Sequence, residues 1–182
     1  MTGFTGRWAL RGAVSHDPGV KYVFTGDDRT GVEAVVGDVQ MTLDLLIERW
    51  LAGEALVPEP AVEPASGLVL DIGPDLTFTE RGAAEVEWFC EEGVLEPRAK
   101  PFDGRIVTKP TGSHLLLSEP VTWAQPYRED VDVPLRMDDG DTKIADTIEL
   151  VGARLRRRVS VVTDEMYVTR VLYEYGPDHP HR

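Results

Sequence analysis

Short segments that alternate between apolar and polar residues are the feature that most constrains how this sequence can fold. Between Phe4 and Leu10 every second side chain falls on one side of an extended chain, which places Trp8 on the apolar side. Similar segments recur as far as Tyr175 and are separated by Gly, Pro or charged turns. The expected strands after the first cover residues 22–24, 68–72, 76–80, 84–90, 105–109, 114–117, 121–123, 144–151, 154–163 and 166–175.

This pattern predicts an all-β fold with roughly one or two short helices at most. An antiparallel β-barrel is the favoured architecture, because a closed sheet exposes no edge strand, and a β-sandwich is the alternative. A chain of 182 residues can bury a core of its own, so we expect a single domain over residues 1–182. Within it, residues 54–67 are predicted as a Pro-rich loop and residues 176–182 as a flexible tail.

The segment 39–52 is compatible with two secondary structures. Its apolar residues alternate as in a strand up to Leu45, but from Leu43 to Leu51 they also recur with the spacing of an amphipathic helix. One interpretation is a strand through Leu45 followed by a helical turn. The other is a single helix over about residues 42–52. Trp50 packs against a core in both.

Charge and cysteine content narrow the class of protein. Acidic side chains outnumber basic ones by 32 to 19, which gives a net charge of −13. This charge repels phosphate backbones and anionic lipid, so we expect neither a nucleic-acid partner nor a membrane. The single cysteine, Cys90, cannot form an intramolecular disulfide, and a reducing cytoplasm is the expected compartment. Beside Trp88 on an apolar face, Cys90 is more typical of a core residue than of a nucleophile.

Motifs for metal, nucleotide or covalent chemistry do not occur in the sequence. Of the four histidines, His16 and His114 lie far from each other and from the pair His179 and His181 near the C-terminus, and only this pair has ligand-like proximity. The acidic run at 138–141 lacks the spacing of an EF-hand loop. Neither a phosphate-binding glycine motif nor a nucleophile elbow is present. We therefore expect no metal and no cofactor.

Two arginines near the C-terminus are the strongest candidates for a binding site. A two-residue turn at 164–165 would set Thr163 opposite Met166 and would place Arg157 and Arg170 on one otherwise apolar face. Buried arginines need an anionic partner, so either a protein carboxylate or a ligand should contact them.

Two alternatives to a ligand stay open for these arginines. They could pair with inward acids such as Asp146 or Glu174. The register could also be shifted by one residue, which would expose both arginines. In the favoured register Arg154, Arg156 and Arg158 lie on the opposite face, where solvent satisfies their charges.

Two short segments resemble a known group of barrels. Residues Phe4 to Trp8 read Phe-Thr-Gly-Arg-Trp, and residues Tyr167 to Tyr173 read Tyr-Val-Thr-Arg-Val-Leu-Tyr. They resemble the opening strand of the calycin group, which contains the lipocalins, and the closing strand of its fatty-acid-binding branch. The resemblance implies that Trp8 closes the barrel floor and that Arg170 anchors a ligand carboxylate. The tyrosine follows Arg170 by three residues and not two, so Leu172 takes its place and Tyr173 points away from the cavity.

These observations predict a lipocalin-like β-barrel that binds a hydrophobic small molecule, with Arg157 and Arg170 as anchors where the ligand is anionic. The residues that line or close the cavity are the tryptophans Trp8, Trp50, Trp88 and Trp123. Small barrel cyclases and isomerases of natural-product pathways are similar in size, so the ligand is either carried or converted without covalent chemistry. Whether the protein is an enzyme stays open. The alternative is a ligand-free interaction or inhibitor module with an acidic surface. The oligomeric state is open, with a homodimer as one alternative.

Overall fold

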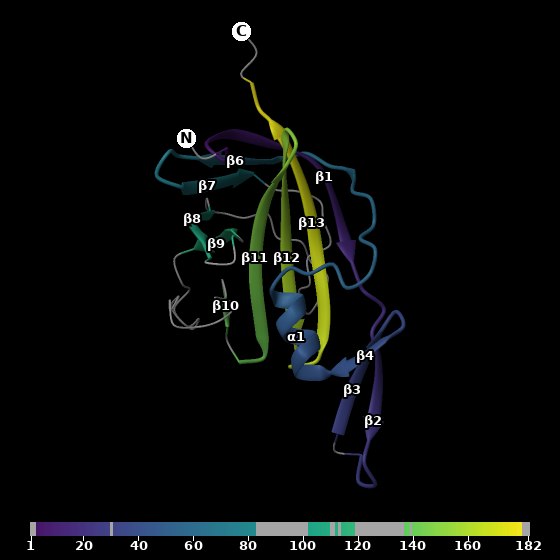
Figure 1. Cartoon of the computed structure of the whole chain (residues 1–182). Coiled ribbons are helices and arrows are strands. Elements are labelled where there is room, and N and C mark those ends of the chain that lie inside the picture. Colours follow the sequence, from purple (N-terminus) through teal and green to yellow (C-terminus); the bar gives the residue numbers. More distant parts are fainter. Residues whose placement is uncertain are drawn as a thin grey trace.

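The computed structural model describes residues 3–29, 31–82, 102–109, 112, 114–118, 137–138 and 140–179. Within these residues, eight antiparallel strands close into a barrel, which confirms the predicted fold class over the sandwich (Figure 1). In spatial order the ring contains β1 (Gly6–His16), β6 (Leu68–Ile72), β7 (Thr77–Gly82), β8 (Phe102–Thr108), β9 (His114–Ser118), β11 (Thr142–Val151), β12 (Arg154–Thr163) and β13 (Tyr167–Pro177).

The order of strands around the ring follows their order along the chain. Each ring strand pairs with the next one, and β13 returns to pair with β1. The barrel is therefore of the up-and-down kind. In the described part of the chain, two residue pairs join β9 to β11, namely Thr147 with Leu115 and Ile148 with His114. We call this short junction the seam.

The connection from β1 to β6 carries a helix and four further strands. They are β2 (Lys21–Thr25), β3 (Gly31–Val36), β4 (Val39–Thr42), α1 (Leu43–Leu51) and β5 (Glu63–Pro64). The strands β2, β3 and β4 form a separate sheet that extends beyond one end of the barrel, and α1 lies over the outer face of β11–β13 (Figure 1). A further short strand, β10 (Met137–Asp138), pairs with β11.

Local sequence sets both ends of α1. The Thr42 hydroxyl accepts a hydrogen bond from the backbone N–H of Leu45 at 3.3 Å and caps the N-terminus. Beyond the other end, Gly53 has a φ of 84°, and a Cβ there would stand 2.9 Å from the Thr147 hydroxyl oxygen. Of the two interpretations of residues 39–52, the helical one is closer, because the strand ends at Thr42 and not at Leu45.

The turn between β12 and β13 corrects the predicted register. Thr163 pairs with Tyr167 and not with Met166, so residues 164–166 connect the two strands. Asp164 and Glu165 both lie in the left-handed region, with φ values of 52° and 54°. The predicted two-residue turn omits one residue of this connection, and a shift of one residue exchanges the two faces of a strand.

Arg157 and Arg170 consequently lie on opposite faces of the sheet, and the prediction that they share one face is wrong. Arg157 pairs with Tyr173 on the side of the barrel interior. Arg170 pairs with Ser160 and points outward, where it contacts the end of α1. The same shift turns Tyr173 inward, in contrast to the orientation expected from the resemblance to fatty-acid-binding proteins.

Two apolar cores lie on the two sides of β11–β13. Trp8, 7% exposed, belongs to the core inside the barrel, and Trp50, 0% exposed, belongs to the core outside it, so the predicted burial of both is confirmed. The barrel core comprises Phe4, Trp8, Leu10, Ala13, Leu68, Leu70, Ile72, Phe78, Ile106, Leu116, Ile144, Ile148, Leu155, Val159, Val161, Val171, Tyr173 and Tyr175. The outer core comprises Ala34, Val36, Met41, Leu46, Trp50, Leu51, Ala145, Val162 and Val168.

Residues 54–67, expected as a Pro-rich loop, run from α1 along the outside of the barrel, and we call them the strap. Leu56 and Val57 pack against the outer core. Further along, β5 pairs with β1, and the backbone N–H of Ala65 donates to the Arg11 carbonyl at 3.1 Å. The strap is therefore attached to the barrel at both of its ends.

The predicted tail begins inside a strand. β13 continues to Pro177, which pairs with Trp8 of β1. Next to it, Arg7 Nε donates to an Asp178 carboxylate oxygen at 2.8 Å. The N-terminal and C-terminal strands of the ring are thus joined along their length.

Candidate functional site

Two groups of polar side chains lie on the two faces of β11–β13. The inner group, which we call the interior cluster, consists of Glu80 from β7, Asp146 from β11, Arg157 from β12 and Tyr175 from β13. Each of these side chains is at most 1% exposed. Because β7 lies across the ring from β12, closure of the barrel brings together residues that are distant in the sequence.

Arg157 is the centre of the interior cluster. Its Nε and Nη2 donate to the two oxygens of Asp146 at 2.8 and 2.7 Å, which is a bidentate ion pair. Its Nη1 donates to Glu80 and, at 3.3 Å, to the Tyr175 hydroxyl. Tyr175 in turn donates its hydroxyl proton to Glu80 at 3.1 Å. The cluster thus contains two carboxylates and one guanidinium.

Burial and charge together fix the protonation of two members. Burial alone would lower the pKa of Arg157, but Asp146 and then Glu80 outweigh it and raise the pKa well above the ordinary value. Burial and the neighbouring Glu80 raise the pKa of Tyr175 well above its ordinary value. Arg157 therefore stays charged, and Tyr175 keeps a proton that it can donate.

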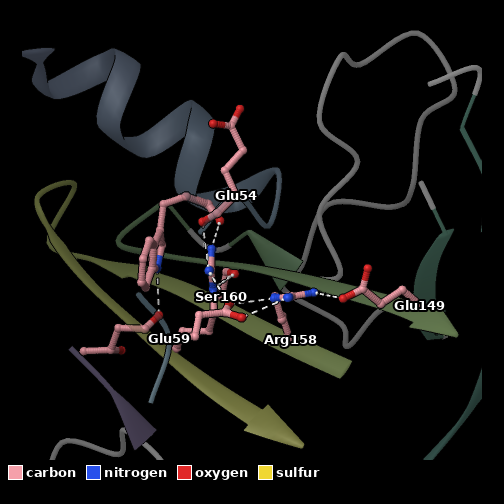
Figure 2. A network of polar contacts seen from close by, with 8 residues as sticks. Glu54, Glu59, Glu149, Arg158 and Ser160 are labelled. Atoms are coloured by element: carbon pink, nitrogen blue, oxygen red, sulfur yellow. Dashed lines mark hydrogen bonds and ion pairs between the residues drawn. The ribbon is translucent and has the colours of Figure 1, made fainter. Parts of the chain in front are cut away.

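The outer group consists of Arg158 and Arg170 with the groups that they contact, and Figure 2 shows this network with Arg158 labelled. Arg170 Nη2 donates to the carbonyl of Trp50 at 2.8 Å, and Nη1 donates to the carbonyl of Glu54 at 2.9 Å. Its guanidinium carbon lies 3.8 Å from the centre of the Trp50 ring, and its Nε donates to the Ser160 hydroxyl at 2.8 Å. A cation at the C-terminal end of a helix satisfies carbonyls that have no partner within the helix. Arg170 therefore fastens α1 to the barrel.

Glu59 joins the strap to this outer group. Arg158 donates from Nε and Nη2 to both oxygens of Glu59, at 2.7 and 2.9 Å, and Arg170 donates to one of them at 3.3 Å. Arg158 Nη1 also donates to Glu149 at 2.6 Å, so the guanidinium lies between two carboxylates (Figure 2). One carboxylate of the strap thus contacts two arginines of the barrel.

Burial shifts the titration of the outer group. Burial lowers the pKa of Arg170 to about 10, although Glu59 opposes the change. Burial would raise the pKa of Glu59, but the hydrogen bonds and charge of Arg158 outweigh it and leave the pKa lowered. Burial, and then the charge of Arg170, also lower the pKa of His16, whose ring centre lies 5.8 Å from that of Trp50. The folded state therefore disfavours protonation of both Glu59 and His16.

A cleft of about 340 Å³ opens on the outside of the barrel at the seam. Its wall combines the end of α1 with residues of β11, β12 and the β9 side of the seam. The lining residues are Ala52, Gly53, Gly112, His114, Thr147, Ile148, Glu149 and Arg158.

The structure separates the residues that the sequence placed in one site. Arg157 and Trp8 lie on the interior side, whereas Arg170 and Trp50 lie outside the barrel. Trp8 Nε1 donates to the Phe4 carbonyl at 2.8 Å, and its barrel-floor role stays a prediction. The predictions for Trp88, Cys90 and Trp123, and for strands at 84–90 and 121–123, concern residues outside the described ranges.

Sequence reasoning missed most partners of the arginines. It named Asp146 as one acid that could pair with Arg157, and this alternative is confirmed. Glu174 instead pairs with Arg154 outside the barrel. The position of Glu80 on the same strand face as the buried Phe78 is the sequence signal of this inward acid.

In the described ranges, His, Cys, Asp and Glu side chains form no group of three that could hold a metal ion. Among the same residues, no helix has the length and apolar character needed to cross a membrane. Comparison with family models, with curated proteins and with solved structures finds no match to this chain.

Proposed function

We propose that this protein binds a small, mostly apolar molecule inside its barrel, as its resemblance to the calycin group implies. One observation carries the proposal: the interior cluster, with three charged side chains, lies within an otherwise apolar barrel core. Burial of charges costs free energy, and replacement of buried ion pairs by apolar residues is often neutral or stabilising. Contact with the polar group of a ligand therefore accounts for these residues better than stability does.

The charge of the interior cluster defines the polar group of the ligand. Glu80 and Asp146 each offer about four acceptor positions. Among the described residues that form the interior cluster, these two carboxylates outnumber the one guanidinium, that of Arg157. A carboxylate ligand would add a third negative charge in an interior of low dielectric constant. A ligand with a hydroxyl group is therefore favoured over the anionic ligand expected from the sequence.

The same residues suit a conversion of the ligand without a cofactor. Tyr175 and Glu80 are hydrogen-bonded at 3.1 Å, and Tyr175 holds its proton. A carboxylate can take a proton from one ligand atom while a neighbouring phenol stabilises charge that develops on an oxygen. Return of the proton to a second atom completes an isomerisation or cyclisation with no change in composition. This is the enzymatic form of the proposal.

Calorimetric titration with decan-1-ol and decanoate tests the proposal. We expect decan-1-ol to bind at least about tenfold more tightly than decanoate, a difference of about 1.4 kcal/mol. Tyr175→Phe keeps the volume of the side chain and removes the hydroxyl, and it should weaken decan-1-ol binding. Tyr167→Phe, at a residue that is 53% exposed, is the matched control and should change nothing.

Other outcomes contradict the proposal in distinct ways. Tighter binding of decanoate would show that Arg157 binds an anionic ligand although it already contacts Glu80 and Asp146. If Tyr175→Phe and Tyr167→Phe change the affinity for decan-1-ol equally, the interior cluster does not contact the ligand. A parent protein that binds neither probe would favour the alternative class, an acidic interaction or inhibitor module without a ligand.

A further inference from the structure

The cleft at the seam is a second candidate site and is separate from the interior cluster. Its volume of about 340 Å³ falls in the lower part of the range typical of small-molecule sites. It is lined by Arg158, whose side chain points outward, and not by its neighbour Arg157. A ligand can therefore occupy the cleft whether or not the barrel interior is filled.

The shape of the cleft depends on the end of α1. Gly53, with a φ of 84°, ends the helix and brings the backbone against Thr147. On the far side, a Cβ at Gly112 would meet no atom of the described residues within 4 Å. The two glycines thus leave space where side chains would otherwise fill the cleft.

The accessible charge of the cleft is negative. The Glu149 side chain is 46% exposed, whereas that of Arg158 is 13% exposed and both oxygens of Glu59 already contact its guanidinium. The Arg170 guanidinium already donates to carbonyls at the C-terminal end of α1, so the helix dipole is left out of the charge of the cleft. The net charge of −13 adds a negative field over the whole surface. The exposed carboxylate and this field both favour a cation.

We propose that the cleft binds a small organic ammonium ion. The ammonium group donates to Glu149, whose carboxylate Arg158 holds in place through the 2.6 Å hydrogen bond. The carbon skeleton of the ligand packs against Ala52 and Gly53 at the end of α1.

Three probes of nearly equal size test this site: 2-phenylethylamine, 2-phenylethanol and 3-phenylpropanoate. Backbone NMR shifts of the full chain locate each probe. We expect the amine to shift the signals of Ala52, Gly53 and Thr147 and to bind at least about tenfold more tightly than the alcohol. The acid should show no saturable binding at the cleft.

Two variants test whether Glu149 binds the ammonium group. Glu149→Gln should weaken amine binding about tenfold and leave the alcohol unchanged. Glu174→Gln removes a carboxylate that pairs with Arg154 and does not line the cleft, so it should leave both probes unchanged. Equal affinity for amine and alcohol would overturn the proposal. So would a preference for the acid, NMR shifts elsewhere, or no saturable binding of the amine.

Discussion

Arg157 and Arg158 are neighbours in β12, yet they lie in different environments. Arg157 points into the barrel, where Glu80 and Asp146 meet it from other strands of the ring. Arg158 points outward, where Glu59 meets it from the strap and Glu149 from the adjacent strand. The first set of partners exists only when the ring closes, whereas the second requires the strap to dock.

Two residues of the same type, adjacent on one strand, can therefore have different structural roles. Period-two alternation sends neighbouring side chains to opposite faces, so two adjacent arginines belong to different parts of the molecule. The interior arginine is fully desolvated, and its loss would remove the cation that contacts two buried carboxylates. The outer arginine keeps some contact with solvent, which can replace a lost partner.

Replacement of Arg157 and of Arg158 by methionine should lower the free energy of unfolding by different amounts. Arg157→Met should lower the free energy of unfolding by about 3 to 5 kcal/mol, the range for breaking a buried ion pair. Arg158→Met should lower it by about 1 kcal/mol, since its site is partly hydrated. Equilibrium urea denaturation measures both. Equal losses would mean that the inner and outer faces do not differ in the way that burial indicates.

Arg170→Met is expected to have an intermediate effect. It removes a cation that donates to the carbonyls of Trp50 and Glu54, and hydrogen bonds to charged groups contribute about 1.5 to 3 kcal/mol. Urea denaturation should show a loss in this range. Decan-1-ol affinity should stay unchanged, because Arg170 lies outside the barrel. A loss of that affinity without a loss of stability would instead support the anchoring role implied by the calycin resemblance.

How much of this could be predicted depends on whether a feature is local. Alternation along each segment predicted the barrel and the burial of Trp8, because each strand carries its own pattern. The predicted register of the last hairpin was wrong by one residue. Asp164 and Glu165 adopt positive φ, and no glycine in the sequence marks this turn. The contact of Glu80 with Arg157 could not be predicted without knowing how the ring closes.

The titration of His16, which lies beside the outer core, should make stability depend on pH near neutrality. The pKa of His16 is lowered in the folded state, so below its ordinary value of 6.5 the unfolded state binds a proton that the folded state does not. Stability should therefore fall as the pH decreases through about 6.5. The groups around this ring are Arg170, Glu59, Asp17 and Trp50.

His16→Gln is the matched variant for this part of the profile. It should flatten the slope of unfolding free energy against pH between about 7 and 5, where an ordinary histidine titrates. Urea denaturation of parent and variant across that range measures the slope. A variant that keeps the parent's slope would assign the titration to another group.

The smallest effect concerns Glu59 and the strap. The pKa of Glu59 is lowered, so its contribution to stability is present above the ordinary value of 4.5 and is lost as the pH falls through the lowered folded value.

At neutral pH, Glu59→Gln keeps the shape of the side chain but weakens its ion pairs with Arg158 and Arg170. We expect cleavage within residues 54–67 to become faster in limited proteolysis, since local opening of the strap exposes its backbone. The barrel should stay intact because its own strands are not altered. A matched change, Glu149→Gln, leaves the strap contact in place and should not accelerate cleavage there. If both variants cleave at the parent's rate, the apolar packing of Leu56 and Val57 holds the strap and the ion pairs do not.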